Sequence, residues 1–545
     1  MKFFTYLAAF LLSLSSTVVF AQDADDELKG ELKFENVTMG GYAQGSTPMA
    51  ITSDGNVVMT GTTASMTTGR TSSFIAMSSK DLPSSPLWKI DLDGSSIVTS
   101  IVSDGNGGIF VGGNFRSSIN FNGANGNIAL KGKFDAEDYS GTKINTFIAH
   151  INKEGKTLAA KAITSTANPD VLKNNPYYDS YNAYCNLSSL VYANGKLYAG
   201  LNFQDVISND DDSKKLASAT YDMYGALYSS TSFTVAEIDL NSMGISSFPI
   251  VLGGNSSDPG FMGLDIKNAK IASDGTNLYL AATPTGWSST VTLWLNDEKS
   301  DDATFDITNW NINGFYVASI NLLSNQLVAS KHFDGVCETS DSNSKIGDIF
   351  VSGDNLVIAG SFMQNCPFNK SIRVVGNTDL FTACLNKSDL STKSVLTSKF
   401  DETKSGGDQE VYSCMGVLDD MLSISGYVTK ENAYSSKNEM VAPLSFFAAN
   451  YSSNNAEFEE NDSETDDEYI IGAVLATDGS LYLANLSHDQ NTYFYLYSSK
   501  ETDGVKNIEA APISKDAVIY NLQGMKLRAP QKGLNIINGK KVLVK

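Results

Sequence analysis

Three of the four tryptophans of the chain, Trp287, Trp294 and Trp310, lie in one polar stretch between Thr285 and Gly314. Flat aromatic side chains bind sugar rings and partner proteins, because they bury a large area at a small cost in conformational entropy. The three tryptophans are therefore candidate ligand-binding residues. The alternative is that they pack against one another as the small core of their own loop.

A second aromatic group occurs in the segment NPYYDSYNAY. It contains Tyr177, Tyr178, Tyr181 and Tyr184, with the acidic Asp179 among them. Aromatic and acidic side chains together suit the rim of a ligand site, so these tyrosines are also candidate binding residues. The alternative is that they cover an exposed junction between two repeats.

Two segments of the chain are strongly acidic. Asp210, Asp211 and Asp212 carry the hard oxygen atoms that calcium prefers, but they lack the alternating Asp-x-Asp-x-Asp-Gly spacing that places oxygens around an ion. We therefore predict no metal site and keep the three acids only as candidate calcium ligands. The segment 457–468 has so many like charges that self-repulsion favours a solvated loop.

The residues that catalysis would need are sparse. The histidines, His150, His332 and His488, fall in different repeats, and the sequence has no HExxH, no GxSxG and no glycine-rich phosphate loop. A histidine on a strand, such as His150, is expected to pack within its sheet. A carbohydrate-active enzyme needs only two carboxylates at a suitable separation, which a sequence does not reveal. A binding function is favoured, no cofactor is expected, and the enzyme alternative stays open.

The charge of the chain argues against a nucleic-acid partner, and its cysteines argue against a zinc site or a disulfide-rich scaffold. The 545 residues carry a formal net charge of -22, whereas nucleic-acid binding depends on Lys and Arg that displace counterions, so no nucleic-acid partner is expected. The five cysteines form no CxxC pair, which gives no support for a zinc site or a disulfide-rich scaffold. Burial is the expected role for most of them.

The elements that must position these residues come from a repeated β-hairpin. A turn such as Asp104-Gly105 between two apolar segments favours a hairpin, because its central residues adopt positive φ. The predicted second strands are VVMTGTT from Val57, IFVGGNF from Ile109, LYAGLNF from Leu197, LYLAATP from Leu278, LVIAGSF from Leu356, LSISGYV from Leu422 and LYLANLS from Leu481.

Most hairpins are followed by two further strands, as in FIAHINKEGKTLAAKAI from Phe147. Four strands per unit and seven units predict an all-β fold, a seven-bladed β-propeller. The last unit lacks a fourth strand, and an unassigned strand at Glu31 to Met39 precedes the first hairpin. We expect this N-terminal strand to complete the seventh blade, which would leave no long sheet edge exposed.

A family resemblance supports the same fold. The span from Val111 to Ile163, with GGNF, INFNG and FIAHINKEGKTLAAK, resembles the β-propeller repeat of exported bacterial proteins. The resemblance covers most of residues 31–502. It implies the propeller fold but little about activity, because such repeats occur in adhesive, scaffolding and uncharacterised proteins alike.

The N-terminus predicts export. Residues 1–21, MKFFTYLAAFLLSLSSTVVFA, contain Lys2, an apolar run, and the small residues Val19 and Ala21 before Gln22, which is the pattern of a secretory signal peptide. No later run is long and apolar enough to span a bilayer, so no transmembrane segment is expected.

The C-terminal tail, AVIYNLQGMKLRAPQKGLNIINGKKVLVK, resembles the sorting domain of Bacteroidota type IX secretion cargo, with matches at Tyr520, Gly524, Gly533 and the final GKKVLVK. Asn535 stands where an aromatic residue is usual, and the tail is shorter than the family domain. The resemblance implies the type IX secretion machinery as a partner and a secreted or cell-surface location. A periplasmic location is the alternative, and so is a small C-terminal β appendage with no sorting role.

The expected order is a signal peptide at 1–21, an acidic segment at 22–30, the seven-bladed propeller at 31–502, a linker at 503–512 and the sorting-domain-like tail at 513–545. In an antiparallel blade, the connection between strands two and three and the connection to the next blade share one face. The long insertions fall in these connections, which predicts a loop-rich binding face.

These observations favour a non-enzymatic binding module for a glycan or a protein. One alternative is a carbohydrate-active hydrolase or lyase that uses carboxylates at the propeller mouth. Another is a structural component of the cell envelope, which would present a large and flat apolar patch.

Overall fold

The computed structural model describes residues 28–34, 37–38, 48–64, 71–123, 126–133, 144–175, 184–223, 225–256, 264–286, 289–307, 314–334, 344–374, 379–397, 408–418, 421–431, 438–449, 458–460, 468–476, 480–487, 492–498, 519–520, 526–527, 533–537 and 540–544. Within these ranges the fold is all-β, and the one helix is the short α2 (Pro169–Asn174). None of the described helical residues forms a helix long and apolar enough to cross a membrane.

The repeating element is an antiparallel sheet whose four strands lie side by side in chain order. In one such sheet the order is β7 (Ser96–Ser103), β8 (Ile109–Phe115), β11 (Asn145–Ile151) and β12 (Thr157–Ile163). The predicted strands from Ile109 and Phe147 are therefore confirmed. Each sheet of this kind is named below after its first strand.

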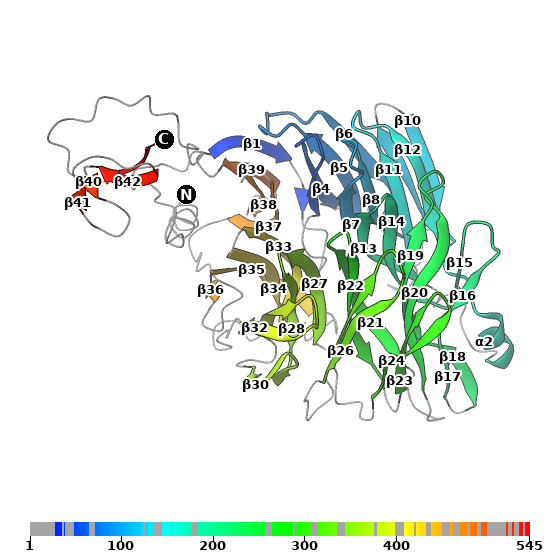
Figure 1. Cartoon of the computed structure of the whole chain (residues 1–545). Helices are drawn as coiled ribbons and strands as arrows, with labels where there is room; N and C mark the ends of the chain where they lie inside the picture. The colour runs from blue at the N-terminus through cyan, green and yellow to red at the C-terminus, as the bar shows by residue number, and fades with distance from the viewer. Residues whose placement is uncertain are drawn as a thin grey trace.

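Sheets of the same order follow along the chain, as Figure 1 shows. Their strands are β13 (Cys185–Ala193), β14 (Lys196–Gln204), β19 (Thr231–Ile238) and β20 (Ile245–Ser256); β21 (Asp265–Ser273), β22 (Asn277–Thr285), β25 (Phe315–Asn321) and β26 (Leu327–Phe333); β27 (Lys345–Ser352), β28 (Asn355–Phe362), β31 (Asp379–Asn386) and β32 (Thr392–Thr397); and β33 (Asp408–Leu418), β34 (Met421–Glu431), β35 (Asn438–Ala449) and β36 (Phe458–Glu460).

The first and last repeats share the N-terminal segment. The β3 sheet contains β3 (Met49–Ile51), β4 (Val57–Ala64), β5 (Thr71–Ser78) and β6 (Trp88–Asp93), and the β37 sheet contains β37 (Glu468–Leu475), β38 (Ser480–Ser487) and β39 (Thr492–Ser498). The C-terminal strands β40 (Ile519–Tyr520), β41 (Lys526–Leu527), β42 (Gly533–Ile537) and β43 (Lys540–Val544) form a sheet of their own.

The N-terminal strand pairs with the last repeat, as the sequence predicts. β1 (Leu28–Phe34) runs antiparallel to β39, with Glu31 opposite Tyr495, and Figure 1 shows the two strands side by side. The bounds differ from the predicted Glu31 to Met39, because β2 (Val37–Thr38) pairs with β4 instead. The N-terminal segment therefore connects the β37 sheet to the β3 sheet.

Short hairpins occupy several connections between second and third strands. They are β9 (Ser118–Gly123) with β10 (Gly126–Lys131), β15 (Val206–Ser208) with β16 (Lys215–Ala217), β17 (Thr220–Met223) with β18 (Ala226–Ser229), β23 (Ser289–Leu295) with β24 (Glu298–Ile307), and β29 (Asn365–Cys366) with β30 (Asn369–Arg373). β9 pairs with β6 and β23 pairs with β20, so these two hairpins extend the outer edge of the preceding sheet.

These insertions lie in the connections in which the sequence predicts them, but the tips of two of them reach turns of the opposite face. At the tip of the β23–β24 hairpin, the backbone N–H of Asn296 donates to Pro249 O at 2.9 Å. The Asn296 side chain accepts a hydrogen bond of 3.3 Å from Asn325, which lies in the short β25–β26 turn. At the β15–β16 tip, Asp210 N–H donates to Ile245 O at 2.8 Å, beside the short β19–β20 turn. Sheet edges offer unpaired backbone groups, so the insertions run along them to the opposite face.

The first strands of successive sheets contact one another in chain order, from β3 through β7, β13, β21, β27 and β33 to β37, and β37 also contacts β3. All of these strands from β7 onward contain a β-bulge. The bulges fall between Val98 and Ser100, Leu187 and Ser189, Lys267 and Lys270, Ile346 and Asp348, Val411 and Ser413, and Ile470 and Gly472. A bulge interrupts the ladder and leaves backbone groups that need other partners.

At two of these bulges, a serine hydroxyl accepts a hydrogen bond from a backbone N–H of the neighbouring first strand. Ser100 directly follows the bulge of β7, and its Oγ accepts from the Leu190 N–H at 2.9 Å. Ser189 directly follows the bulge of β13, and its Oγ accepts from the Ile271 N–H at 3.0 Å. The same contact thus joins the β7 sheet to the β13 sheet and the β13 sheet to the β21 sheet.

Apolar side chains fill the space between the sheets. Between the β13 and β21 sheets the buried side chains include Phe233, Leu252 and Leu280. The recurring alanine of the third strands is fully buried at each position that the structure describes with a side chain, Ala76, Ala149, Ala236, Ala318 and Ala383. Cys185, Cys366 and Cys384 are free, buried thiols, as expected for most of the cysteines.

Removal of the Ser189 hydroxyl leaves the Ile271 N–H without its acceptor. We expect Ser189→Ala to lower the free energy of unfolding by about 1–3 kcal/mol, the usual cost of an unsatisfied donor in a protein interior. Urea denaturation measures this change. Ser246→Ala, which removes an exposed hydroxyl, is the matched control and should change stability by less than about 0.5 kcal/mol. Equal losses in the two variants would contradict the proposed role of Ser189.

Candidate functional site

Tyr184, one of the predicted site residues, lies directly before β13 on the face of the long connections. Its hydroxyl forms a hydrogen bond of 2.8 Å with the Thr231 hydroxyl at the start of β19. Burial raises the pKa of this phenol, so it is protonated at neutral pH. Tyr177, Tyr178 and Tyr181 lie outside the described residues, and their role stays a prediction.

Asp265 is the first residue of β21 and belongs to the sheet that follows the β13 sheet. Through Thr231, it is linked to Tyr184. Its Oδ1 atom accepts from the Thr231 backbone N–H at 2.9 Å. Burial is the main cause that raises the pKa of Tyr184 and of Tyr221, and the negative charge of Asp265 raises both pKa values further. Both phenols therefore lie within electrostatic reach of this carboxylate.

Tyr221 and Tyr228 form a stacked pair on the β17–β18 hairpin. They stand directly opposite each other in the antiparallel register, with ring centroids 5.6 Å apart and an interplanar angle of 22°. Both side chains are half-buried. This pair and Asp265 were not predicted from the sequence, although tyrosines on both sides of the Gly225 turn indicate that two rings could meet across a hairpin.

Tyr184, Tyr221, Tyr228 and Asp265 are called the tyrosine–aspartate cluster below. Its half-buried rings offer apolar area, burial raises the pKa of the Tyr184 and Tyr221 phenols, and its carboxylate accepts a hydrogen bond. This combination suits a ligand that has both apolar C–H groups and hydroxyl or amide donors, such as a sugar or a peptide. The cluster contains one carboxylate, whereas glycoside hydrolysis ordinarily uses two.

Trp294 lies on β23, outside the tyrosine–aspartate cluster. It stands opposite Val251 of β20 and Lys299 of β24, and its side chain is half-buried. Trp287 and Trp310 lie outside the described residues, so the predicted grouping of the three tryptophans stays a prediction.

Asp210, Asp211 and Asp212 form the turn between β15 and β16. The Asp210 carboxylate pairs with Lys161, and this hydrogen bond is the main cause that lowers the pKa of Asp210. Asp211 Oδ1 accepts from the Ser213 N–H at 3.0 Å, and Asp212 adopts a φ of 57°. In the part of the chain that the structure describes, no three His, Cys, Asp or Glu side chains are grouped so as to hold a metal ion.

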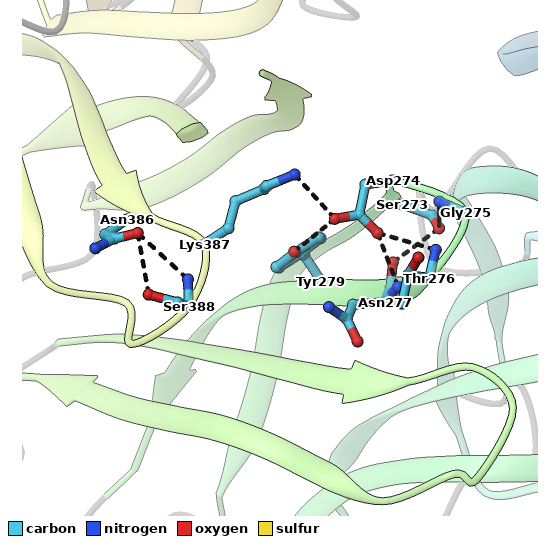
Figure 2. Close-up of polar contacts among 9 residues, drawn as sticks. All are labelled: Ser273, Asp274, Gly275, Thr276, Asn277, Tyr279, Asn386, Lys387 and Ser388. Atoms are coloured by element: carbon cyan, nitrogen blue, oxygen red, sulfur yellow. Dashed lines mark hydrogen bonds and ion pairs between the residues drawn. The ribbon is translucent and has the colours of Figure 1, made fainter. Parts of the chain in front are cut away.

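Asp274 lies in the β21–β22 turn and joins two sheets, as Figure 2 shows. Its carboxylate accepts from the N–H groups of Thr276 (3.0 Å) and Asn277 (2.8 Å), the Tyr279 hydroxyl (3.0 Å) and the Lys387 ammonium of the β31–β32 turn (3.0 Å). Burial acts to raise the pKa of Asp274, but these hydrogen bonds outweigh it and lower the pKa to about 2.

Asp104 occupies the corresponding turn of the β7 sheet. Its Oδ1 accepts from the N–H groups of Asn106 (2.7 Å) and Gly108 (2.9 Å), and its Oδ2 lies 2.9 Å from His150 Nε2. The His150 ring packs on Phe110, with centroids 4.5 Å apart. The expected packing of His150 within its sheet is confirmed.

His332 is covered by the inserted β23–β24 hairpin. Its ring stacks on Phe305 with centroids 3.9 Å apart, and its Nδ1 lies 2.8 Å from Asp334 Oδ1. Burial lowers the pKa of His332, which Asp334 partly offsets. The third histidine, His488, lies outside the described residues. His150 and His332 therefore have structural partners on separate sheets.

No family model and no curated protein matches this chain. The solved structures that it resembles are β-propeller proteins. They include Chaetomium thermophilum Sqt1 bound to the N-terminus of the ribosomal protein L10 (9% identity, TM-score 0.36, covering 87% of this chain and 100% of that chain), the polysaccharide lyase Uly1 (9%, 0.39, 87% and 99%) and a B. megaterium levansucrase (10%, 0.35, 85% and 95%). Identities and scores this low transfer no function to this chain.

Asp274→Asn removes the charge that the hydrogen bonds of this turn stabilise. Because the folded-state pKa of Asp274 is depressed, its contribution to stability is present above about pH 4 and is lost as the pH falls toward 2. We expect the variant to lose about 1–3 kcal/mol at pH 7, and the difference from the wild type to shrink between pH 4 and 2. Urea denaturation across this pH range measures both.

Asp301→Asn is the control, because the Asp301 side chain is 90% exposed, and it should leave stability within about 0.5 kcal/mol of the wild type at every pH. A difference between Asp274→Asn and the wild type that stays constant down to pH 2 would contradict this assignment.

Proposed function

We propose that the described sheets belong to a seven-bladed β-propeller. The contacts between first strands support this, because they run in chain order from β3 to β37 and β37 also contacts β3. The Tyr482 hydroxyl of β38 donates to Lys80 O, which follows β5, at 2.7 Å, and so ties the last repeat to the first. The pairing of β1 with β39 supports closure of the ring by the N-terminal strand.

The proposed biochemical role is a non-enzymatic binding module that recognises a glycan or a protein. The observation that carries it is the tyrosine–aspartate cluster, which combines half-buried aromatic rings with a carboxylate where two sheets meet. The Tyr221–Tyr228 pair stands on an inserted hairpin rather than on the repeated strands. A repeated frame that carries unit-specific insertions is typical of recognition proteins.

Binding is favoured over catalysis because the other acids that stand out have structural partners. Asp274 accepts four hydrogen bonds within the protein, and Asp104 accepts two backbone hydrogen bonds and contacts His150. A carbohydrate-active hydrolase or lyase is the second candidate, since Asp265 lies close to protonated tyrosines. That function would require a second acidic group beside Asp265.

Export is part of the same proposal and is supported by the sequence. The signal-peptide pattern at 1–21 favours secretion, and the tail at 513–545 favours the type IX secretion machinery of Bacteroidota as the route to the cell surface or the medium. A periplasmic location is the alternative.

A glycan array tests the binding function with the chain that begins at Gln22. We expect the double variant Tyr221→Ala, Tyr228→Ala to weaken binding at least about tenfold, because stacked tyrosines are typical binding hot spots. Leu323→Ala is the matched control, because it removes an apolar side chain that is 83% exposed in the β25–β26 turn, and its binding should equal that of the wild type.

Mass spectrometry of the bound glycans separates the two candidate functions. Recovery of intact glycans supports a binding module, whereas cleaved glycans would replace it with the hydrolase or lyase. A wild-type chain that binds no glycan would rule out the glycan form of the proposal. Binding that persists at full strength in the double variant would exclude the tyrosine–aspartate cluster as the site.

A further inference from the structure

Asp205 lies between β14 and β15, and its side chain is fully buried. Its backbone adopts a φ of 70°, a left-handed conformation that Asp and Asn tolerate better than most other residues. Such a conformation persists only where the surrounding structure determines it, and a buried carboxylate needs hydrogen-bond partners. The contacts of Asp205 therefore show what this residue holds in place.

Both ends of the β17–β18 hairpin contact Asp205. Ser218, two residues before β17, accepts from the Asp205 N–H through its Oγ at 2.9 Å and donates its own N–H to Asp205 O at 2.7 Å. Ser229, the last residue of β18, donates its hydroxyl to Asp205 Oδ1. Ser218 and Ser229 are also buried. One buried aspartate thus closes the base of this hairpin from both sides.

The base of the hairpin sets the direction of its tyrosine rings. Among the strands that the structure describes, β17 and β18 pair only with each other, so the repeated sheets do not align them through a ladder. Ser229 faces Asp205, and successive side chains of a strand point to opposite faces, so Tyr228 projects away from the buried base. Tyr221 stands opposite Tyr228, one pair beyond Thr220 and Ser229. The contact of Ser229 with Asp205 therefore orients both rings.

The carboxylate of Asp205 has a cationic neighbour on another sheet. Lys133, two residues after β10, donates from its ammonium to Ser165 O at 3.2 Å, and Ser165 Oγ donates to the O atom of Val206, which directly follows Asp205, at 3.2 Å. Burial lowers the pKa of Lys133, and the negative charge of Asp205 acts in the opposite direction. The hairpin is not one of the repeated strands, so these buried polar groups serve what the hairpin carries.

We propose that Asp205 is a positioning residue of the tyrosine–aspartate cluster: it holds the Tyr221–Tyr228 pair in the orientation that binds the ligand and does not contact the ligand itself. A hydrogen bond to a carboxylate is stronger than one between neutral groups, which suits a contact that must fix a whole hairpin. Aromatic rings that are oriented before binding avoid the cost of ordering them on association. The inference rests on the binding function proposed above.

Fluorine NMR of the fluorotyrosine-labelled chain that begins at Gln22 tests the positioning role without a ligand. Tyr221→Phe and Tyr228→Phe identify the two resonances, which the stacked ring of the partner shifts. Asp205→Gly removes the carboxylate and tolerates the positive φ, so we expect both resonances to move toward the value of a solvent-exposed fluorotyrosine. Asp205→Asn keeps the Oδ1 acceptor and should retain the wild-type resonances. Ser229→Ala removes the donor of the same hydrogen bond and should reproduce the effect of Asp205→Gly.

Asp104→Gly is the matched control, because it removes another buried aspartate, the one that accepts hydrogen bonds in the β7–β8 turn. It should leave the resonances of Tyr221 and Tyr228 in place, and thermal unfolding verifies that each variant folds. Unchanged resonances in folded Asp205→Gly or Ser229→Ala would overturn the proposal. An equal shift in Asp104→Gly would also overturn it, because the shift would then report general loss of stability.

Affinity for a glycan that the wild type binds completes the test. Asp205→Gly should weaken binding at least about tenfold, whereas Asp205→Asn should stay within about threefold of the wild type. Full affinity in folded Asp205→Gly would contradict the positioning role. A wild-type chain that binds no glycan would instead overturn the glycan form of the proposed function, and the NMR result on Asp205 does not depend on that outcome.

Discussion

The hydrogen bonds between bulged first strands are the interaction on which the rest of the structure depends. A bulge removes backbone groups from their own ladder, and the serine after the bulge of one strand accepts from the backbone of the next strand. These contacts fix the β7 sheet to the β13 sheet and the β13 sheet to the β21 sheet, whose third strands place the fully buried Ala149, Ala236 and Ala318. Because a hydrogen bond is directional, the two contacts restrict how these three sheets are oriented relative to one another.

The two faces differ because of how the strands are connected. On the short-turn face, side chains tie neighbouring turns together, as in Asp274 with Lys387 at 3.0 Å and Asn194 with Gly275 O at 2.6 Å. Connections between second and third strands contain the inserted hairpins, and side chains also join two of their tips, as in Lys214 with Asp297 at 2.6 Å. Some of these hairpins extend sheet edges, and the one that bears Tyr221 adds aromatic surface beside Asp265. The proposed recognition surface thus lies on an inserted connection and not on the repeated strands.

Local signals in the sequence predict the repeated strands well, because a turn such as Asp104-Gly105 specifies its hairpin within a few residues. The paths of the insertions depend on pairing between strands of different repeats, for example β23 with β20. Local sequence patterns do not reveal which distant strand an insertion will pair with. The tyrosine–aspartate cluster unites Tyr184 and Asp265, which are far apart in the chain.

Amide hydrogen exchange in the native protein tests the central role of the bulged strands most directly. The amides of Leu190 and Ile271, which donate to serine hydroxyls, are compared with those of Asp210 and Asn296, which donate to carbonyls at hairpin tips. If the first strands hold the sheets together, Leu190 and Ile271 exchange only through global unfolding and the hairpin amides exchange faster through local opening. Exchange of Leu190 and Ile271 as fast as the hairpin amides would contradict this account.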